Sequence, residues 1–404
     1  MSVGGQIDPR PYPAIVPVEL VLAVVVPVAA ILSLNVYARQ LPVFLITAIP
    51  AGIALYAHGL LPRPRSVVLL GAVLYCAGIL LATVLTSDVA LLQFAYMVLP
   101  CVYLLYFVYI VSVIPTLDRT HVDMILLLIV VVGAIVAFAN VILFVAGHPA
   151  ATANGGSRLY AAFGVVSGRL PTMISMIYAV FAAAAFGLLV SVGQKRWIRI
   201  LAALCFVTIG TALVLTQTRS GVVGALAGIL AVLPFVRSRV RLYVLGSLAV
   251  VAVLALLAGI GEAVMQRGAS YRTGIWVEFF RWGLETPVLG KGLLTDFGRM
   301  VDGQEFPHAH NLMLSAWLRG GIMSLAGMAL ILGGGIFWAW RYARRFENPV
   351  ILAMIVTVAV AGLFDYQLLA KPTDWTWVAF WLSFGLAAGA EIAVRRDTRA
   401  AAQA

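Results

Sequence analysis

The sequence predicts an all-α membrane protein, a bundle of about twelve transmembrane helices. Of its 404 residues, 63% are hydrophobic and 11% are charged, whereas a soluble domain carries about 25% charged residues. Apolar runs of about 20 residues, enough to cross a bilayer as a helix, recur from one end of the chain to the other. Basic residues gather in alternate connections between these runs, as the positive-inside rule requires. We therefore expect a single integral-membrane domain over residues 1–404.

Helix-breaking and charged residues between the apolar runs give the expected spans, with boundaries that are good to a few residues. These spans are 18–36, 41–58, 66–86, 90–114, 122–146, 170–192, 198–217, 221–236, 242–260, 312–340, 349–366 and 375–394.

The basic connections assign an orientation to the bundle. The positive-inside rule places them, and with them both chain termini, in the cytoplasm. Their basic residues are Arg63, Arg65, Arg119, Lys195, Arg196, Arg199, Arg237, Arg239, Arg241, Arg341, Arg344, Arg345, Arg395, Arg396 and Arg399. The two long connections, 147–169 and 261–311, then lie on the periplasmic face. The second lies between the ninth and tenth spans, and its amphipathic composition predicts interfacial helices packed over the bundle.

Several classes of protein are disfavoured. The net charge of +11 is spread over short connections rather than gathered in one module, so we do not expect nucleic-acid binding. Cys76, Cys101 and Cys205 lie in apolar runs without a short pairing, which indicates neither a disulfide framework nor a zinc site. The chain has no P-loop or dinucleotide-binding glycine pattern, and we expect no cofactor.

Basic residues on the expected periplasmic face contradict the insertion rule and need another explanation. Guanidinium groups can hold phosphate through two hydrogen bonds, and a lipid-linked pyrophosphate presents its charge at the membrane surface. The residues are Arg158, Arg169, Arg219, Arg267, Arg272, Arg281, Lys291, Arg299 and Arg319. Among them, we expect solvated helix faces for Arg267, Arg281, Arg299 and Arg319.

Arg219 is the most informative of these residues, because it joins two apolar runs with almost no loop between them. A charge held so close to the bilayer is costly without an anionic partner. The alternatives are that Arg219 reaches the lipid headgroups or pairs with Asp365. For Arg272, the alternative is a salt bridge with Glu278 or Glu285.

Two of the five histidines, His308 and His310, lie in the segment 307–311 (Pro-His-Ala-His-Asn), just before an apolar run. A neutral imidazole can accept a proton from a sugar hydroxyl as a general base. The nearest acids, Asp302 and Glu305, show no recognised metal-ligand spacing, so no metal is expected. The alternative is that a histidine caps the following helix.

Four segments together resemble the O-antigen ligase and polymerase superfamily, integral-membrane glycosyltransferases of the GT-C type. They are 215–221 (Leu-Thr-Gln-Thr-Arg-Ser-Gly), Arg272 with Trp276, 287–292 (Pro-Val-Leu-Gly-Lys-Gly), and the His-Asn pair at 310–311 followed by Gly321. The resemblance covers roughly the C-terminal half of the chain, from about Arg158 onward.

In the ligase branch, a His-Asn pair is followed by nine residues, a glycine, two residues, and then Gly, Thr or Tyr. Here the pair at 310–311 is followed by Gly321, but the last position is Ser324. Residues 158–164 resemble the superfamily's arginine segment, although the usual downstream Pro-Asn appears as Pro-Thr at 171–172.

The resemblance implies transfer of an undecaprenyl-pyrophosphate-linked O-antigen to a lipid A-core acceptor. The reaction would take place at the periplasmic face of a bacterial inner membrane and without a metal ion. Inversion follows if the displacement is direct. The resemblance assigns the pyrophosphate to Arg219 and Arg272, with Arg158 as a further candidate, and the acceptor hydroxyl to His310. The possible supporting residues are His308, Asn311, Trp276 and Arg169. Donor, acceptor and membrane lipids are the expected partners.

Two other functions remain open. A polymerase, which uses a second lipid-linked repeat as acceptor, shares the same residues, but the compact length and the segment from Asp365 to Trp375 favour the ligase. A lipid-linked oligosaccharide transporter would need ionisable groups near the membrane midplane, and the expected spans are nearly free of them. A scaffold that only binds its ligand would not account for His310.

Overall fold

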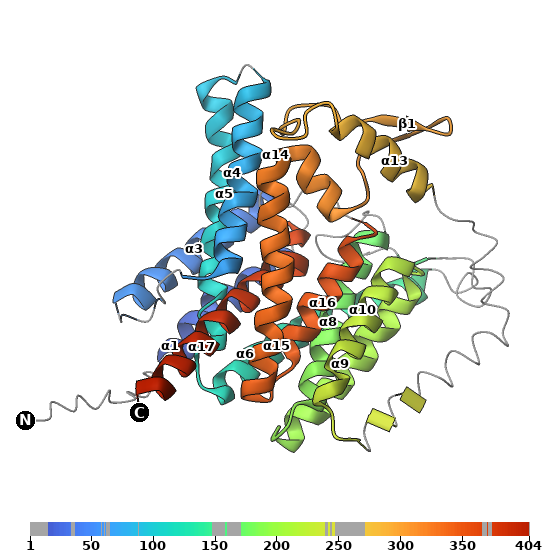
Figure 1. Ribbon diagram of the computed structural model, residues 1–404. Helices are drawn as coiled ribbons and strands as arrows, with labels where there is room; N and C mark the ends of the chain where they lie inside the picture. Colours follow the sequence, from blue (N-terminus) through green and yellow to red (C-terminus); the bar gives the residue numbers. More distant parts are fainter. Residues whose placement is uncertain are drawn as a thin grey trace, which may run out of the picture.

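The chain folds into a bundle of membrane-length helices (Figure 1). The computed structural model describes residues 15–33, 37–57, 59, 61, 65–87, 89–147, 158–159, 171–238, 241–242, 245–246, 271–365, 370 and 374–403. Among these residues, seven helices are long and apolar enough to cross a membrane: Val67–Thr86, Leu91–Thr116, Arg119–Gly147, Pro171–Val190, Arg196–Leu215, Leu312–Phe346 and Trp377–Gln403. The protein is therefore a multi-pass membrane protein.

Helices from the N-terminal and C-terminal parts of the chain pack together. The N-terminal part contributes α1 (Ile15–Leu20), η1 (Val21–Val25), α2 (Val26–Ser33), α3 (Tyr37–Ala57), α4 (Val67–Thr86), α5 (Leu91–Val111), η2 (Ile114–Thr116) and α6 (Arg119–Gly147). The C-terminal part contributes α8 (Pro171–Val190), α9 (Arg196–Leu215), α10 (Arg219–Val232), η3 (Leu233–Phe235), α13 (Arg272–Gly283), α14 (Leu312–Ala329), η4 (Leu330–Gly334), α15 (Gly335–Phe346), α16 (Val350–Gly362), η5 (Trp377–Trp381) and α17 (Leu382–Gln403). Between the two parts, α4 packs against α14.

The helices coincide with the apolar runs found in the sequence, which confirms the all-helical membrane fold. The expected span 242–260 lies almost entirely outside the described residues. The tenth span is longer than expected, because α14, η4 and α15 form one continuous helical segment from Leu312 to Phe346.

Small residues let the central helices approach closely, as is usual in membranes. A Cβ atom added at Gly78 of α4 would lie 2.4 Å from the Ser324 Oγ of α14. A Cβ added at Gly228 of α10 would lie 2.5 Å from the Ala353 carbonyl oxygen of α16. A Cβ at Gly224 would meet Ala361 of α16 at 2.7 Å, so the start of α10 lies beside the end of α16.

The segment 287–292 is hydrogen-bonded to α14 at the kink of that helix. The Ile322 N–H donates to the Val288 carbonyl at 3.1 Å, and the Lys291 N–H donates to the Leu318 carbonyl at 2.7 Å. The helix is kinked at Gly321, whose φ of 60° and ψ of −155° are essentially open only to glycine. The segment 287–292 and Gly321, which both contribute to the family resemblance, thus meet at the kink of α14.

The connection before α14 is only partly helical. It contains the helix α13, but β1 (Arg299–Val301) and β2 (Gln304–Phe306) form an antiparallel hairpin. Its turn residues, Asp302 and Gly303, have φ angles of 49° and 79°, as a two-residue type I′ turn requires. Figure 1 shows α13 and β1 over the end of the bundle where α14 begins.

Candidate active site

His310 is positioned by the residue that follows it. The Asn311 side chain caps α14 by accepting the Leu314 N–H at 3.0 Å, and its amide donates to the Leu363 carbonyl at 3.2 Å. His310 itself has a φ of 48°, a left-handed conformation that costs a non-glycine residue about 1–3 kcal/mol. This strained conformation directs the His310 side chain toward the end of α16.

His310 forms a pair with Asp365. Its Nδ1 lies 3.0 Å from the Asp365 Oδ1, and the two side chains are 26% and 12% exposed. A carboxylate can only accept a hydrogen bond, so the bond assigns the proton to Nδ1. The lone pair of His310 Nε2 is then free to accept a proton from a substrate.

Arg272, the first residue of α13, lies beside this pair. Its Nε donates to the Phe364 carbonyl at 3.0 Å. Burial lowers the pKa of Arg272, Asp365 raises it, and the positive charge of Arg219 lowers it further. Arg272 remains protonated at neutral pH, since guanidinium groups do not lose their proton in proteins. Two guanidinium groups close enough to repel each other favour an anion between them.

Arg219 reaches this point from the N-terminus of α10. The residue two positions before it, Gln217, has a φ of 50°, so the chain turns sharply into the helix. The Arg219 side chain is exposed, and the N-terminus of α10 adds partial positive charge. Because α10 packs against α16, Arg219 stands at the same end of the bundle as Asp365.

Arg158 supports the turn that carries Arg219. Its Nε donates to the Thr216 carbonyl at 3.1 Å, and its Nη2 donates to the Thr218 hydroxyl at 3.1 Å. The Leu159 N–H also bonds to the carbonyl of Leu215 at 2.8 Å. Two of the three guanidinium nitrogens of Arg158 are therefore engaged in holding this turn.

Trp276 lies one helical turn after Arg272, and its ring centroid is 6.2 Å from that of Phe364. The indole Nε1 is buried and has no hydrogen-bond partner among the described residues. A buried donor of this kind is costly unless a ligand accepts from it. On the other side of the site, the Phe306 ring centroid lies 6.4 Å from that of His310.

The rings of His308 and His310 lie against each other, with centroids 3.8 Å apart and planes tilted by 41°. With Asp365 they form a group whose ligand atoms lie within 4.8 Å of one another, which could hold a metal ion. The sequence pattern could not indicate this group, because its acid comes from another segment. The guanidinium groups of Arg219 and Arg272 disfavour a divalent cation here electrostatically, and the arrangement suits proton transfer and anion binding better.

Other basic residues have structural roles. The expectation of a solvated face is wrong for Arg319, whose guanidinium carbon lies 3.2 Å from the Phe297 ring centroid. Its Nη1 donates to the Gly292 and Leu293 carbonyls at 3.2 and 3.1 Å. Arg299 stacks on Trp282 at 3.6 Å. Arg169 and Arg267 lie outside the described residues.

The acidic partners also differ from the alternatives raised by the sequence. Glu285 pairs with Lys291 at 2.6 Å. Asp365, which the sequence offered as a partner of Arg219 and not as a site residue, is bonded to His310. The signal that could have identified it is its position directly after the apolar run of α16.

One comparison with known proteins bears on these residues. Residues 203–329 match the family model described as O-antigen ligase, whereas no curated protein matches the chain. The matched region contains Arg219, Arg272 and His310 and ends before Asp365. The match over residues 203–329 agrees with the resemblance that the motifs indicated.

Proposed function

We propose that this protein is a glycosyltransferase that joins an undecaprenyl-pyrophosphate-linked O-antigen to lipid A-core at the periplasmic face of a bacterial inner membrane. One observation carries the proposal. A histidine oriented by a carboxylate lies beside two neighbouring guanidinium groups, at one end of a membrane helix bundle. The donor's pyrophosphate would lie at that depth when its polyprenyl chain is in the bilayer.

The reaction is a direct displacement at the anomeric carbon of the donor sugar. The oxygen of an acceptor hydroxyl forms the new glycosidic bond, and its proton passes to His310 Nε2. The bond between the anomeric carbon and the pyrophosphate oxygen breaks, and its electrons leave with the pyrophosphate. Such a displacement inverts the configuration of the anomeric carbon.

Asp365 orients the histidine and stabilises its charged form. By accepting from Nδ1, it keeps the Nε2 lone pair directed away from the pair, and its negative charge favours the imidazolium that forms as the proton arrives. Asp365 is thus a positioning residue that acts through His310.

Arg272 and Arg219 stabilise the leaving group. Negative charge grows on the pyrophosphate as the bond breaks, and guanidinium groups fixed before the reaction meet that charge without reorganisation. Their mutual repulsion in the free protein would be relieved by the same anion. This scheme uses no metal ion.

The test is transfer in vitro by purified wild-type protein and His310→Ala, with lipid-linked O-antigen as donor and lipid A-core as acceptor, both with and without EDTA. We expect ligated product from the wild type alone. Product from both proteins would remove His310 from the mechanism, and loss of wild-type product on adding EDTA would assign a metal to the group with His308.

A second reaction mixture, with lipid-linked repeats and no lipid A-core, distinguishes a polymerase from a ligase. Only a polymerase would lengthen the glycan under these conditions. Lengthening by folded wild-type protein, without ligation when lipid A-core is added, would replace the ligase by the polymerase.

A further inference from the structure

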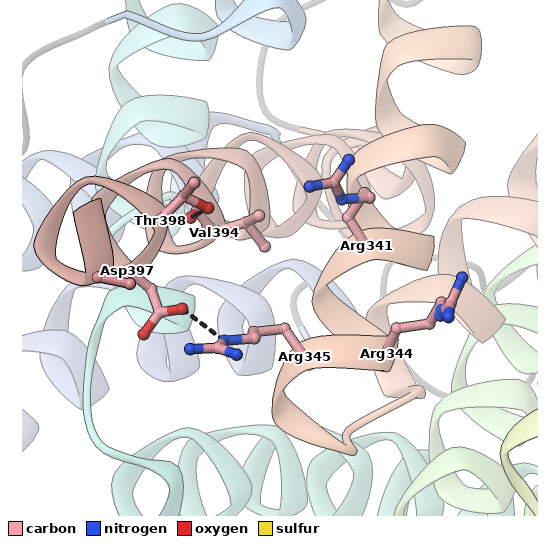
Figure 2. A pocket seen from close by; sticks show the side chains of 7 residues that line it. Arg341, Arg344, Arg345, Val394, Asp397 and Thr398 are labelled. Atoms are coloured by element: carbon pink, nitrogen blue, oxygen red, sulfur yellow. Dashed lines mark hydrogen bonds and ion pairs between the residues drawn. The ribbon is translucent and has the colours of Figure 1, made fainter.

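A second charged site lies at the other end of the bundle. The helical segment Leu312–Phe346 begins next to His310 and ends in the arginines of α15. There α15 and α17 line an open hollow of about 440 Å³ (Figure 2), within the range of about 300–1,000 Å³ usual for ligand pockets. We call it the basic hollow; it is lined by Arg341, Arg344, Arg345, Val394, Asp397, Thr398 and Ala401.

The charges of the basic hollow do not balance. Asp397 is paired with Arg345 through an Nε–Oδ2 distance of 2.5 Å. Among the described residues, Arg341 and Arg344 form no ion pair with a carboxylate. Two guanidinium groups without a carboxylate partner thus line the hollow, and guanidinium groups bind phosphate through paired hydrogen bonds.

The surroundings of the hollow indicate which phosphate compound it binds. The Arg341 guanidinium carbon lies 5.9 Å from the ring centroid of Phe337, a residue that is 51% exposed. Trp340, on the same helix, is 37% exposed. Exposed aromatic rings beside arginines at the end of a membrane helix are typical of the lipid headgroup layer.

We propose that the basic hollow binds the phosphate headgroup of an anionic phospholipid. The positive-inside rule accounts for arginines at this end of the bundle, but it does not account for a concave site with two uncompensated guanidinium groups. Basic pockets between transmembrane helices at this depth suit such headgroups. The acyl chains would then lie along the exposed face of Phe337. This site is independent of the reaction proposed for His310.

The experiment measures phosphatidylglycerol and phosphatidylcholine retained by the full-length protein in native mass spectrometry. We expect the wild type to prefer phosphatidylglycerol. Arg341→Ala with Arg344→Ala should weaken that binding about fivefold per arginine removed. The matched control removes the same charge from exposed residues outside the hollow, Lys195→Ala with Arg196→Ala, and should leave binding unchanged.

A third variant tests whether removing a negative charge from the basic hollow strengthens the binding of phosphatidylglycerol. Asp397→Asn releases Arg345 from its ion pair and should strengthen binding of phosphatidylglycerol. If the arginine double variant does not fold, Ala401→Glu, which keeps the arginines and adds a negative charge, should weaken binding.

Three results would overturn the proposal. The first is absence of a preference for phosphatidylglycerol in the wild type, and the second is an equal loss in both double variants. The third is thermal stabilisation by millimolar inorganic phosphate, in phosphatidylcholine alone, that equals the effect of phosphatidylglycerol. That result would assign the hollow to a soluble phosphate compound.

Discussion

Arg272 is held in a fixed position, and its positive charge is repelled by the positive charge of Arg219. Its Nε is bonded to the Phe364 carbonyl, so the remaining guanidinium nitrogens are available to a ligand in a defined orientation. Lysine would keep the charge but lose both the backbone bond and the two-pronged geometry.

Arg272→Lys should therefore lower kcat/KM for transfer by about 10- to 100-fold, because part of the stabilisation of the leaving pyrophosphate is lost. Arg281→Lys is the matched control, since Arg281 lies exposed near the end of the same helix. The measurement is kcat/KM for transfer by each variant with purified donor and acceptor. Equal values for the two variants would contradict the assignment of the pyrophosphate to Arg272.

Asp365→Asn should reduce kcat by about 10²–10⁴-fold while leaving the KM for the donor nearly unchanged. The asparagine can turn its amide toward Nδ1, which would place the imidazole proton on Nε2, the atom that has to accept one. The control makes the same chemical change at Asp302 in the hairpin turn. A normal kcat for Asp365→Asn would show that His310 does not depend on this carboxylate.

The kink of α14 connects the family motifs to the shape of the site. A Cβ atom at Gly321 would lie 1.9 Å from the Val288 carbonyl oxygen, and the backbone angles there suit only glycine. The resemblance identified this glycine from its spacing alone. Its physical reason, a bend that receives the 287–292 segment, appears only when both segments are seen together.

Gly321→Ala should therefore destabilise the protein by about 2 kcal/mol or more. Gly333→Ala is the control, because a Cβ at Gly333 of the same helical segment meets nothing within 4 Å and alanine favours a helix. Thermal unfolding in detergent measures both variants. Equal unfolding temperatures would mean that α14 can straighten without cost.

The hairpin of residues 299–306 has a turn signal in the sequence, but the helical composition of the surrounding connection outweighed that signal. The Asp-Gly pair at 302–303 is a strong indicator of a two-residue turn, yet the composition of the long connection favoured helices throughout. Strands of three residues are too short for an alternating pattern to stand out, so local turn chemistry was the only available sign.

For the molecule as a whole, hydropathy was sufficient to predict the membrane-length helices that the structure describes, because each must satisfy its own backbone in lipid. It could not predict which helix ends meet. The pairing of His310 with Asp365 and the approach of Arg219 to Arg272 follow from close glycine contacts between α10 and α16 and from the docking of α13, contacts that join residues far apart in the chain. Residue types and motif spacing nevertheless selected three of these four side chains.

The orientation of the bundle can be tested directly, because Cys76, Cys101 and Cys205 are buried and give little background for labelling. A cysteine at the exposed Gln304 of the hairpin should react with a membrane-impermeant maleimide in cells whose outer membrane alone is opened. A cysteine at the exposed Ala401 should react only after the inner membrane is permeabilised, since the positive-inside rule places the arginine-rich end in the cytoplasm. The reverse pattern would place His310 in the cytoplasm, where the reaction proposed here could not meet its periplasmic donor.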